Sequence, residues 1–591
     1  MKLLVYDFEI FKYDHLLGII DLETDKVIQI WGDDNIRLFI NEHLNDIWIG
    51  HNNIGYDELI LEACLMKKNL YNESKKLINS SIRPRSMKKT FQYDTMYGIY
   101  SLKTTELVSG KNISESPISF DIQRQLTDEE KTLVESYNKD DLNQTKSNFF
   151  DQLYEFEMRI AILKEFNVSL KNLSVSGTKL AAIVLGAKKI PQIEDMPVRP
   201  KMYDTLKLKN QAVIDFYMNE DFRKNKKLEI MLCGCIHYLG AGGIHAAKKK
   251  CYYSKALYFD VSGYYNLIMI NYNLLPRTLP QKSREMYINM YHEQLRLKSI
   301  DPFKRQVYKT ILLSVFGAMM NKYTDFYDPW NGLLVTITGQ IFLVDLLEKL
   351  EGKVDVIQSN TDGIMVDLKD WSKKDEVIDI VNEWETRTGF VIKKEEIHDL
   401  WQRDVNNYFY RDSKNEPYVK GEAVRGYWLA EKPVLSQLWN LKEPAIIAKS
   451  ICDFFLYNIK PEETIENELH KNLLEFMYVV KKLSYDYCQY EEYDNNKLVY
   501  SEILQNVNRA FAFNNFSKIC TITKYKNQDG KIKKTSVSSL PDNIFVWNKE
   551  MISENAKNEI ISKIDKNWYI NRAYERIKEF IPIVGDIKVY E

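Results

Sequence analysis

The chain has 591 residues, of which 45% are hydrophobic and 28% are charged, and its formal net charge at pH 7 is −2. This length exceeds what one hydrophobic core supports, so we expect several domains, and the composition excludes a chain that is disordered throughout. The near-zero net charge argues weakly against a simple nucleic-acid-binding protein, but not against an enzyme whose acidic sites offset basic grooves.

Cysteine use and hydropathy bear on the cellular compartment. The seven cysteines show no paired CxxC spacing, which favours reduced thiols over disulfides or a zinc site. The first residues, MKLLVYDFEIF, reach acidic side chains at once, and no apolar run is long enough to span a bilayer. We therefore expect a cytoplasmic protein without membrane contact.

The first predicted element is a β-strand with two acidic residues, Leu3 to Ile10. Its alternation with period two places Asp7 and Glu9 on the same face. Two neighbouring carboxylates on a core strand repel each other. They are tolerable if they hold a cation.

Two later segments add acids. A strand from Asp46 to Gly50 precedes a helix that begins near Tyr56, with Asp57 in its first turn, where the helix dipole favours a carboxylate. A helix is predicted over residues 126–156, and there Tyr137 and Asp141 share one face. Four acids with oxygen ligands only are typical of a two-ion magnesium or manganese phosphodiester hydrolase. Each fragment alone is weak, because D-x-E occurs by chance and YNKDD could be a solvated helix face.

The segment from Tyr238 to Lys250 contains three glycines and then a lysine run. Glycines allow the backbone to approach a ligand closely. A flexible loop with a solvated basic tail explains the same residues equally well.

Two further acids end β-prone segments. Asp260 lies at the end of a predicted buried strand, Ala256 to Val261, and Asp362 lies in the turn of a predicted hairpin, residues 354–368. A single aspartate beside a turn is usually only turn chemistry. Two such acids from adjacent strands could hold divalent metal ions between them.

Between these acids the sequence predicts two antiparallel helices, roughly residues 283–297 and 302–320. Asp301 and Pro302 provide an N-cap and a first-turn proline for the second helix. Arg305 and Lys309 share its face, and Lys298 would join them if helix continued across the break. A basic face beside two metal-binding acids is what a triphosphate needs.

The last third begins with a strand-turn-strand segment that presents Lys420 and Gly421. An amphipathic helix is predicted over residues 461–483, a hairpin around Asp529 and Gly530, and a final helix over residues 567–581. The hairpin lysines suit phosphate contacts, although a solvated edge strand is at least as good an explanation. They are Lys524, Lys526, Lys531, Lys533 and Lys534.

In order, DVSGYY (260–265), KTILLSVFG (309–317) and SNTDG (359–363) resemble motifs A, B and C of family B DNA polymerases, particularly compact phage-type members. The family patterns are D-x-x-S-L-Y, K-x-x-x-N-S-x-Y-G and D-T-D-S. Departures occur at Gly263, Leu313, Phe316 and Asn360, the last replacing an aspartate with a neutral amide. The resemblance implies metal binding at Asp260, Val261 and Asp362, and nucleotide binding at Lys298, Arg305, Lys309, Ser314 and Tyr265.

DFE (7–9), NIGYD (53–57) and YNKDD (137–141) similarly resemble the Exo I, II and III motifs of the proofreading 3′-5′ exonuclease attached to such polymerases. Their acids and Tyr137 would then be catalytic, with two Mg²⁺ ions, or Mn²⁺, in each active site. The glycine segment is similar to the family's Y-x-G-G region. DNA contacts are implied at Tyr238, Gly242, Gly243, Lys420 and Asn53.

The resemblance implies an α+β multidomain chain: an RNase H-like exonuclease domain (1–170), an intervening segment with the first part of the palm (171–280), fingers (281–320), the rest of the palm (321–431) and a thumb (432–591). Its partners would be primed or duplex DNA and deoxynucleoside triphosphates, with a helicase or single-strand-binding protein as further candidates. A phage enzyme would work in the bacterial cytoplasm.

The short helical pair leaves no room for the insertions of protein-primed relatives, so we expect a nucleic-acid primer and no terminal protein. Two alternatives remain open: an exonuclease with a catalytically impaired polymerase-like DNA-binding domain, and a non-catalytic DNA-binding replication factor.

Overall fold

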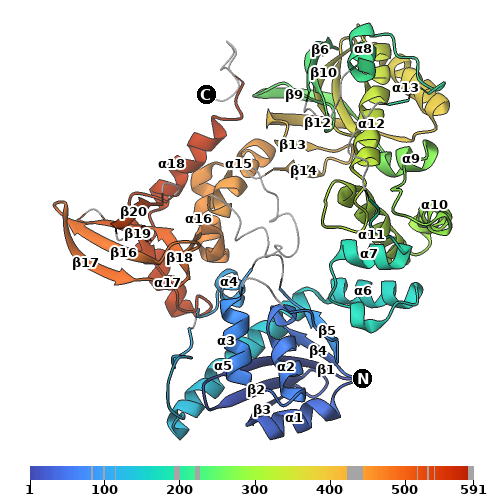
Figure 1. The fold of residues 1–591 in the computed structure, drawn as a ribbon. Coiled ribbons are helices and arrows are strands. Elements are labelled where there is room, and N and C mark those ends of the chain that lie inside the picture. Colours follow the sequence, from blue (N-terminus) through green and yellow to red (C-terminus); the bar gives the residue numbers. More distant parts are fainter. Residues whose placement is uncertain are drawn as a thin grey trace. The chain divides into compact units, whose positions relative to one another are not determined.

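The computed structural model describes residues 1–80, 84–96, 100–113, 115–191, 200–201, 203–219, 226–421, 443–515, 517–528, 531–537 and 540–582. The chain is a mixed α and β protein with two compact units (Figure 1). The first comprises Met1–Val175, Glu431–Ile446 and Ile465–Tyr569, and the second comprises Ser176–Ala430, Ile447–Thr464 and Ile570–Glu591. Most of the segment predicted as a thumb therefore belongs to the same unit as the N-terminal region.

The N-terminal region contains a five-stranded sheet in the order β3-β2-β1-β4-β5. The central strand β1 pairs antiparallel with β2 and parallel with β4, and its bounds match the predicted strand. The strands are β1 (Leu3–Ile10), β2 (His15–Asp21), β3 (Lys26–Trp31), β4 (Ile47–Gly50) and β5 (Phe91–Asp94).

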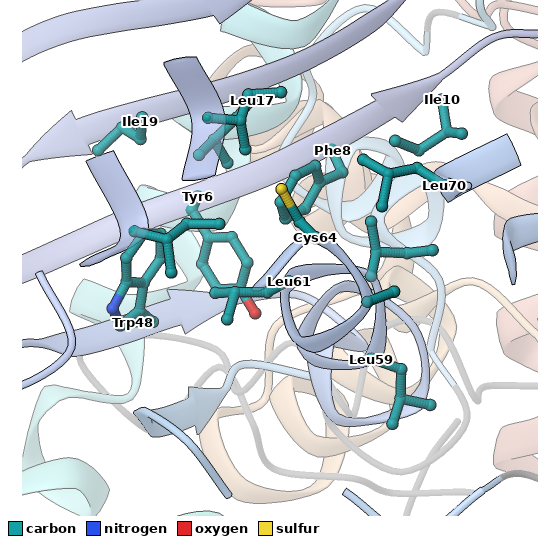
Figure 2. Packing of buried hydrophobic residues seen from close by; sticks show 14 of the residues in the cluster. Tyr6, Phe8, Ile10, Leu17, Ile19, Trp48, Leu59, Leu61, Cys64 and Leu70 are labelled. Carbon is teal, nitrogen blue, oxygen red and sulfur yellow. The ribbon is translucent and has the colours of Figure 1, made fainter. Parts of the chain in front are cut away.

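The hydrophobic core of this region lies on one face of the sheet. Figure 2 shows Tyr6, Phe8 and Ile10 of β1 beside Leu61 and Cys64 of helix α2 (Asp57–Leu65). Because side chains alternate along a strand, the residues between them, Asp7 and Glu9, point to the opposite face. There the strand packs against helix α5 (Asp128–Asp151).

The helix predicted over residues 126–156 is two helices. α5 ends at Asp151, its C-cap Gln152 has φ −107° and ψ 11°, and α6 (Leu153–Glu165) follows. The Gln152 side chain donates to the Thr95 carbonyl at 2.9 Å, which a continuous helix pattern does not reveal. The other helices of this region are α1 (Asp33–Glu42), the 3-10 turn η1 (Asn53–Gly55), α3 (Leu70–Asn79) and α4 (Leu102–Val108).

The later part of the first unit holds two smaller sheets. Their orders are β15-β18-β21 and β17-β16-β19-β20. The fully buried Arg509 of β18 joins this part to the N-terminal region, because its guanidinium donates to the carbonyls of Leu107 and Lys111. The elements are β15 (Tyr478–Lys481), β16 (Tyr487–Asp494), β17 (Lys497–Ile503), β18 (Val507–Ala512), β19 (Ile519–Gln528), β20 (Lys531–Ser536), β21 (Ile544–Val546) and α17 (Glu554–Lys563).

Two predictions for this part have different outcomes. The helix predicted over residues 461–483 is half wrong: α16 (Pro461–Lys471) is present, but residues 478–481 form β15 and pair with β18. The β-prone Tyr-Val-Val run prefers this pairing to helix. The lysine-rich hairpin is confirmed by the pairing of Gln528 with Lys531, while Asp529 and Gly530 lie outside the described residues.

The second unit is built on a nine-stranded sheet in the order β14-β13-β12-β9-β11-β10-β8-β7-β6. The strand ending in Asp260 and the hairpin bearing Asp362 are both confirmed, and they are adjacent in the sheet. The strands are β6 (Leu228–Leu232), β7 (Cys235–Leu239), β8 (His245–Ala247), β9 (Cys251–Val261), β10 (Val354–Asn360), β11 (Gly363–Leu368), β12 (Ile392–Asp404), β13 (Asn407–Arg411) and β14 (Pro417–Lys420).

The predicted helical pair is present as α10 (Gln281–Arg296) and α11 (Pro302–Met319), with Asp301 capping α11 through the Lys304 amide. The short helix α9 (Tyr264–Asn271), which follows Asp260 directly, was not predicted. The remaining helices named here are α7 (Gly177–Leu185), α8 (Gln211–Asn219), α12 (Pro329–Leu350), α13 (Lys374–Thr388), α15 (Ala445–Tyr457) and α18 (Lys566–Ile577). α18 confirms the predicted final helix.

All seven cysteines are free, in agreement with the expected reduced thiols. Within the described ranges, none of the helices combines the length and the apolar character needed to cross a bilayer.

Candidate active sites

Three acids of the N-terminal region meet on the face of β1 opposite the core. Asp7, Glu9 and Asp141 each place one carboxylate oxygen within 4.8 Å of the others. β1 contributes the first two and α5 the third. The predicted pairing of the strand acids with Asp141 is therefore present.

The acids of this cluster resist ionisation. Burial, together with the charge of Asp141, raises the pKa of Asp7 to about 7. Burial and the charges of Asp7 and Asp141 raise the pKa of Glu9 well above its usual range. A bound cation would remove this mutual repulsion, so the cluster is electrostatically suited to a divalent metal ion.

Two polar residues of this site were not found from the sequence. The Lys103 ammonium donates to Asp141 Oδ1 at 2.6 Å and lies 4.7 Å from the centre of the Tyr137 ring. The Asn138 amide donates to Asp7 Oδ2 at 3.0 Å. Asn138 stands next to Tyr137 in the YNKDD segment, but no local pattern identifies Lys103, because α4 brings it to the cluster only in the folded chain.

Asp57 and Asn53, also predicted for this site, are not members of the group of three. Asp57 Oδ1 accepts a hydrogen bond from the Phe8 amide at 3.3 Å, outside the group of three. Burial first, and then the charge of Asp7, raises its pKa. Asn53 is fully buried and donates to Gln92 Oε1 at 2.7 Å, so it is a structural residue and offers no exposed group to DNA.

The second pair of acids meets at the edge of adjacent strands of the nine-stranded sheet. Asp260 of β9 is the register partner of Gly363, the residue after Asp362, and the Val261 amide donates to the Asp362 carbonyl at 2.9 Å. Burial first, and then the charge of Asp260, raises the pKa of Asp362. The pKa of Asp260 is also raised by burial. The two predicted acids therefore lie at the same end of adjacent strands, and the charge of Asp260 acts on Asp362.

The turn that presents Asp362 has an unusual backbone. Thr361 has φ +61°, a left-handed conformation that is an outlier for a β-branched residue. The adjacent Asn360 accepts from the Thr361 hydroxyl at 3.3 Å and adds no negative charge. Such backbone strain is concentrated at functional sites in proteins, which agrees with the proposed role of this turn.

A pocket of about 410 Å³ opens beside Asp362. Three predicted cations, Lys298, Arg305 and Lys309, line it together with Tyr265. The pocket therefore unites the predicted basic face of α11 with one of the two acids.

The Tyr265 ring packs on Phe316 with ring centres 4.1 Å apart. Two other observations depart from the prediction. Ser314 does not line the pocket, and its hydroxyl donates to the Thr310 carbonyl at 2.8 Å, so it is a helix-stabilising residue here. Tyr291 and Gln294 of α10 line the pocket and were not predicted.

The three glycines lie in the connection between β7 and β8, which are strands of the nine-stranded sheet, and β8 pairs with β10. A β-carbon at Gly243 would lie 3.0 Å from Thr361 Cα, so glycine is needed against the turn that presents Asp362. Gln340 donates to the Gly240 carbonyl at 2.8 Å and also bonds the Gly242 carbonyl. Tyr238 is exposed, as a DNA-contacting side chain must be.

Lys420, at the end of β14, acts electrostatically on both acids of the second pair. Its charge lowers the pKa of Asp260 and of Asp362 against the larger effect of burial. Its ammonium lies 5.5 Å from the centre of the Tyr408 ring. This cation therefore lies near the predicted metal site.

Both acid groups fit magnesium or manganese. Their donors are carboxylate oxygens only, which hard divalent cations prefer. Asp7, Glu9 and Asp141 would hold ions in the N-terminal region, with Asp57 adjacent, and Asp260 and Asp362 would hold them in the second unit.

No protein-family model matches the chain, and no curated protein matches it. Among solved structures, the family B DNA polymerase from the hyperthermophilic archaeon Pyrobaculum calidifontis is similar, with a TM-score of 0.41 and 13% sequence identity over 99% of this chain and 78% of that chain. Similarity at this level assigns neither a family nor an activity, so the functional conclusion depends on the residues described above.

Proposed function

We propose that the chain is a template-directed DNA polymerase with its own 3′-5′ proofreading exonuclease. The observation that supports this most directly is the pocket lined by Asp362, Tyr265 and three cations. Lys298 comes from the 3-10 turn between α10 and α11, and Arg305 and Lys309 come from α11. Three cations suit a triphosphate, and the paired acids Asp260 and Asp362 suit the ions that accompany it.

In this proposal each part of the pocket has one task. Lys309, Arg305 and Lys298 bind the phosphates and offset their charge. The Tyr265 ring, held by Phe316, lies under the deoxyribose and excludes a 2′-hydroxyl by its bulk. Bound at either acid group, Mg²⁺ would lower the pKa of the attacking hydroxyl or water and offset charge on the phosphates. Base pairing selects the nucleotide, so the protein needs only backbone contacts to DNA.

The N-terminal cluster would excise mispaired primer ends. Asp7, Glu9 and Asp141 hold the ions, and Tyr137 lies on the same helix as Asp141, one turn away. Lys103 offsets part of the negative charge of Asp141. The partners in this proposal are a nucleic-acid primer on a template and deoxynucleoside triphosphates, in the cytoplasm. The RNase H-like and palm, fingers and thumb arrangement belongs to the same proposal.

The experiment is primer extension with Mg²⁺ and all four deoxynucleotides, run on the wild type, Asp260→Ala and Asp7→Ala. We expect Asp260→Ala to lose extension and keep degradation of the primer, and Asp7→Ala to do the reverse. Unchanged extension by Asp260→Ala would contradict the assignment of the polymerase site. Absence of both activities in the wild type would favour a non-catalytic DNA-binding factor.

A second candidate function is an exonuclease with an impaired polymerase-like DNA-binding domain. The observation that favours it is that Asp7, Glu9 and Asp141 are the one group of three metal-ligating side chains found among the described residues. At the second site, Asn360 stands where motif C of family B DNA polymerases, which this segment resembles, has an aspartate. Asn360→Asp distinguishes the two: little change in extension supports the polymerase, and a large gain supports the impaired enzyme.

A further inference from the structure

The wall of the pocket formed by α10 holds two uncharged polar side chains that are almost fully buried. Tyr291 and Gln294 are 5% and 7% exposed, and both line the pocket. No side-chain hydrogen bond of Tyr291 or Gln294 is seen among the described residues, and neither side chain is among those with fully buried polar atoms that lack a partner. Their polar groups are therefore available to a ligand in the pocket that both residues line.

The facing wall, formed by α11, holds a buried polar atom without a partner. Arg305 Nε is buried and has no hydrogen-bond partner among the residues that the structure describes. Arg305 lines the same pocket. Both helices therefore contribute hydrogen-bonding side chains to the lining of one space of about 410 Å³.

Helix geometry gives the order of these groups along the pocket. α10 ends at Arg296 and α11 begins at Pro302, and the two helices pack against each other as a hairpin. Gln294 and Arg305 are about equally far along the chain from the connecting turn, so they lie at similar heights at a rise of about 1.5 Å per residue. Tyr291 lies about one helical turn further than Gln294 from the connection between the two helices.

The position of Tyr291 is also marked by Gly263. A β-carbon on Gly263 would lie 3.2 Å from the Tyr291 hydroxyl, and Gly263 has φ +63°. Glycine therefore leaves room for this hydroxyl at the end of the pocket that also contains Tyr265.

We infer that Tyr291 and Gln294 are substrate-binding residues of the nucleotide pocket. The Gln294 amide donates to the phosphates that Arg305 binds, and the Tyr291 hydroxyl donates at the sugar end of the triphosphate. α10 is thus an uncharged wall that complements the cationic wall of α11. This inference rests on the proposed polymerase function.

The test compares Tyr291→Phe and Gln294→Met with the wild type. Equilibrium binding of the next correct deoxynucleotide is measured on a complex with a dideoxy-terminated primer and its template, in Mg²⁺. Because a hydrogen bond to a charged group contributes about 1.5–3 kcal/mol, each variant should bind the nucleotide about tenfold to a hundredfold more weakly. Extension at saturating nucleotide should fall much less, so that KM changes more than kcat.

Two controls separate binding from folding. Asn289→Leu removes an exposed amide of α10 that does not line the pocket, and nucleotide affinity should be unchanged. The thermal stability and the primer-template affinity of the two test variants should match the wild type. Inorganic triphosphate, used as a competitor, should bind Gln294→Met more weakly than it binds the wild type.

Each outcome is decisive. If the wild type binds the correct nucleotide and both variants bind it within twofold of the wild type, the inference is wrong and the proposed function stands. If the wild type binds no nucleotide, the proposed function fails and the inference fails with it. A loss in Gln294→Met that Asn289→Leu does not share supports the inference.

Discussion

Asp260 and Asp362 occupy the same end of two hydrogen-bonded strands, because Asp260 is the register partner of the residue that follows Asp362. Each belongs to a segment that is separately unremarkable in sequence. In the fold the charge of Asp260 adds to burial in raising the pKa of Asp362, so the two carboxylates are close enough to interact. The polymerase proposal depends on this pairing.

The first prediction concerns how much the repulsion within the N-terminal acid cluster lowers the stability of the metal-free protein. Asp7→Asn should raise the melting temperature of the metal-free protein at pH 8, because it removes a buried charge that Glu9 and Asp141 repel. The pKa of Asp7 is about 7, so the gain should be at least about 1 kcal/mol. Calorimetry in EDTA measures it, with the exposed Asp140→Asn as the matched control. An equal or lower melting temperature than the wild type would refute the predicted repulsion.

The second prediction concerns metal binding at the same cluster. Mg²⁺ should raise the melting temperature of the wild type, because a ligand at 100 times its Kd adds about 2.7 kcal/mol of stability. The double variant Asp7→Asn with Glu9→Gln should lose most of the stabilisation that Mg²⁺ provides by binding in the first unit. A Mg²⁺ response equal to the wild type in the double variant would show that this cluster holds no ion.

The third prediction concerns Lys103. Lys103→Met leaves Asp141 and Glu106 without the ammonium that bonds both. Breaking a buried pair in this way costs about 3–5 kcal/mol. The melting temperature in EDTA should therefore fall, and Mg²⁺ should restore part of the loss by offsetting the same negative charge. The exposed Lys139→Met is the control, and it should change neither value. A Lys103→Met variant as stable as the wild type in EDTA would contradict the account.

The fourth prediction is a pH dependence of stability. Burial lowers the pKa of His237 to about 4, whereas the unfolded value is near 6.5. The unfolded chain therefore binds a proton that the folded chain refuses, and stability is lost as the pH falls below about 6.5. Between pH 7.5 and 5.5 the loss from this residue should be about 1.4 kcal/mol.

His237→Gln should show a smaller loss of stability between these two pH values than the wild type, whatever its absolute stability. Denaturant titration at both pH values measures the difference. His470, which is exposed, provides the control substitution His470→Gln. Equal losses in His237→Gln and the wild type would mean that His237 is not held neutral by its surroundings.

The sequence was most informative where a feature is local. The strand Leu3–Ile10, the hairpin bearing Asp362 and the cap of α11 at Asp301 all follow from alternation, turn chemistry and capping within a few residues. The face shared by Arg305 and Lys309 follows from helix periodicity in the same way, and both residues line the pocket.

Features that depend on tertiary pairing could not be predicted. Residues 478–481 continue an amphipathic helical pattern, yet they form β15 because β18 offers a partner strand. Lys103 reaches Asp141 from a separate helix, and Tyr291 and Gln294 become pocket residues only when α10 packs against α11. Asn53 matched a motif by its spacing, but its burial against Gln92 makes it structural.

The most direct test of the central claim is single-turnover incorporation of one correct deoxynucleotide by Asp260→Asn, Asp362→Asn and the double variant. Asp367→Asn, in the strand β11 that follows Asp362, is the control. If the two acids form one site, each single change should slow incorporation about a thousandfold or more, and the double variant should be little slower than either, because residues that act as a unit are not additive. Asp367→Asn should incorporate at the wild-type rate. Wild-type incorporation by either single variant of the pair would contradict the account.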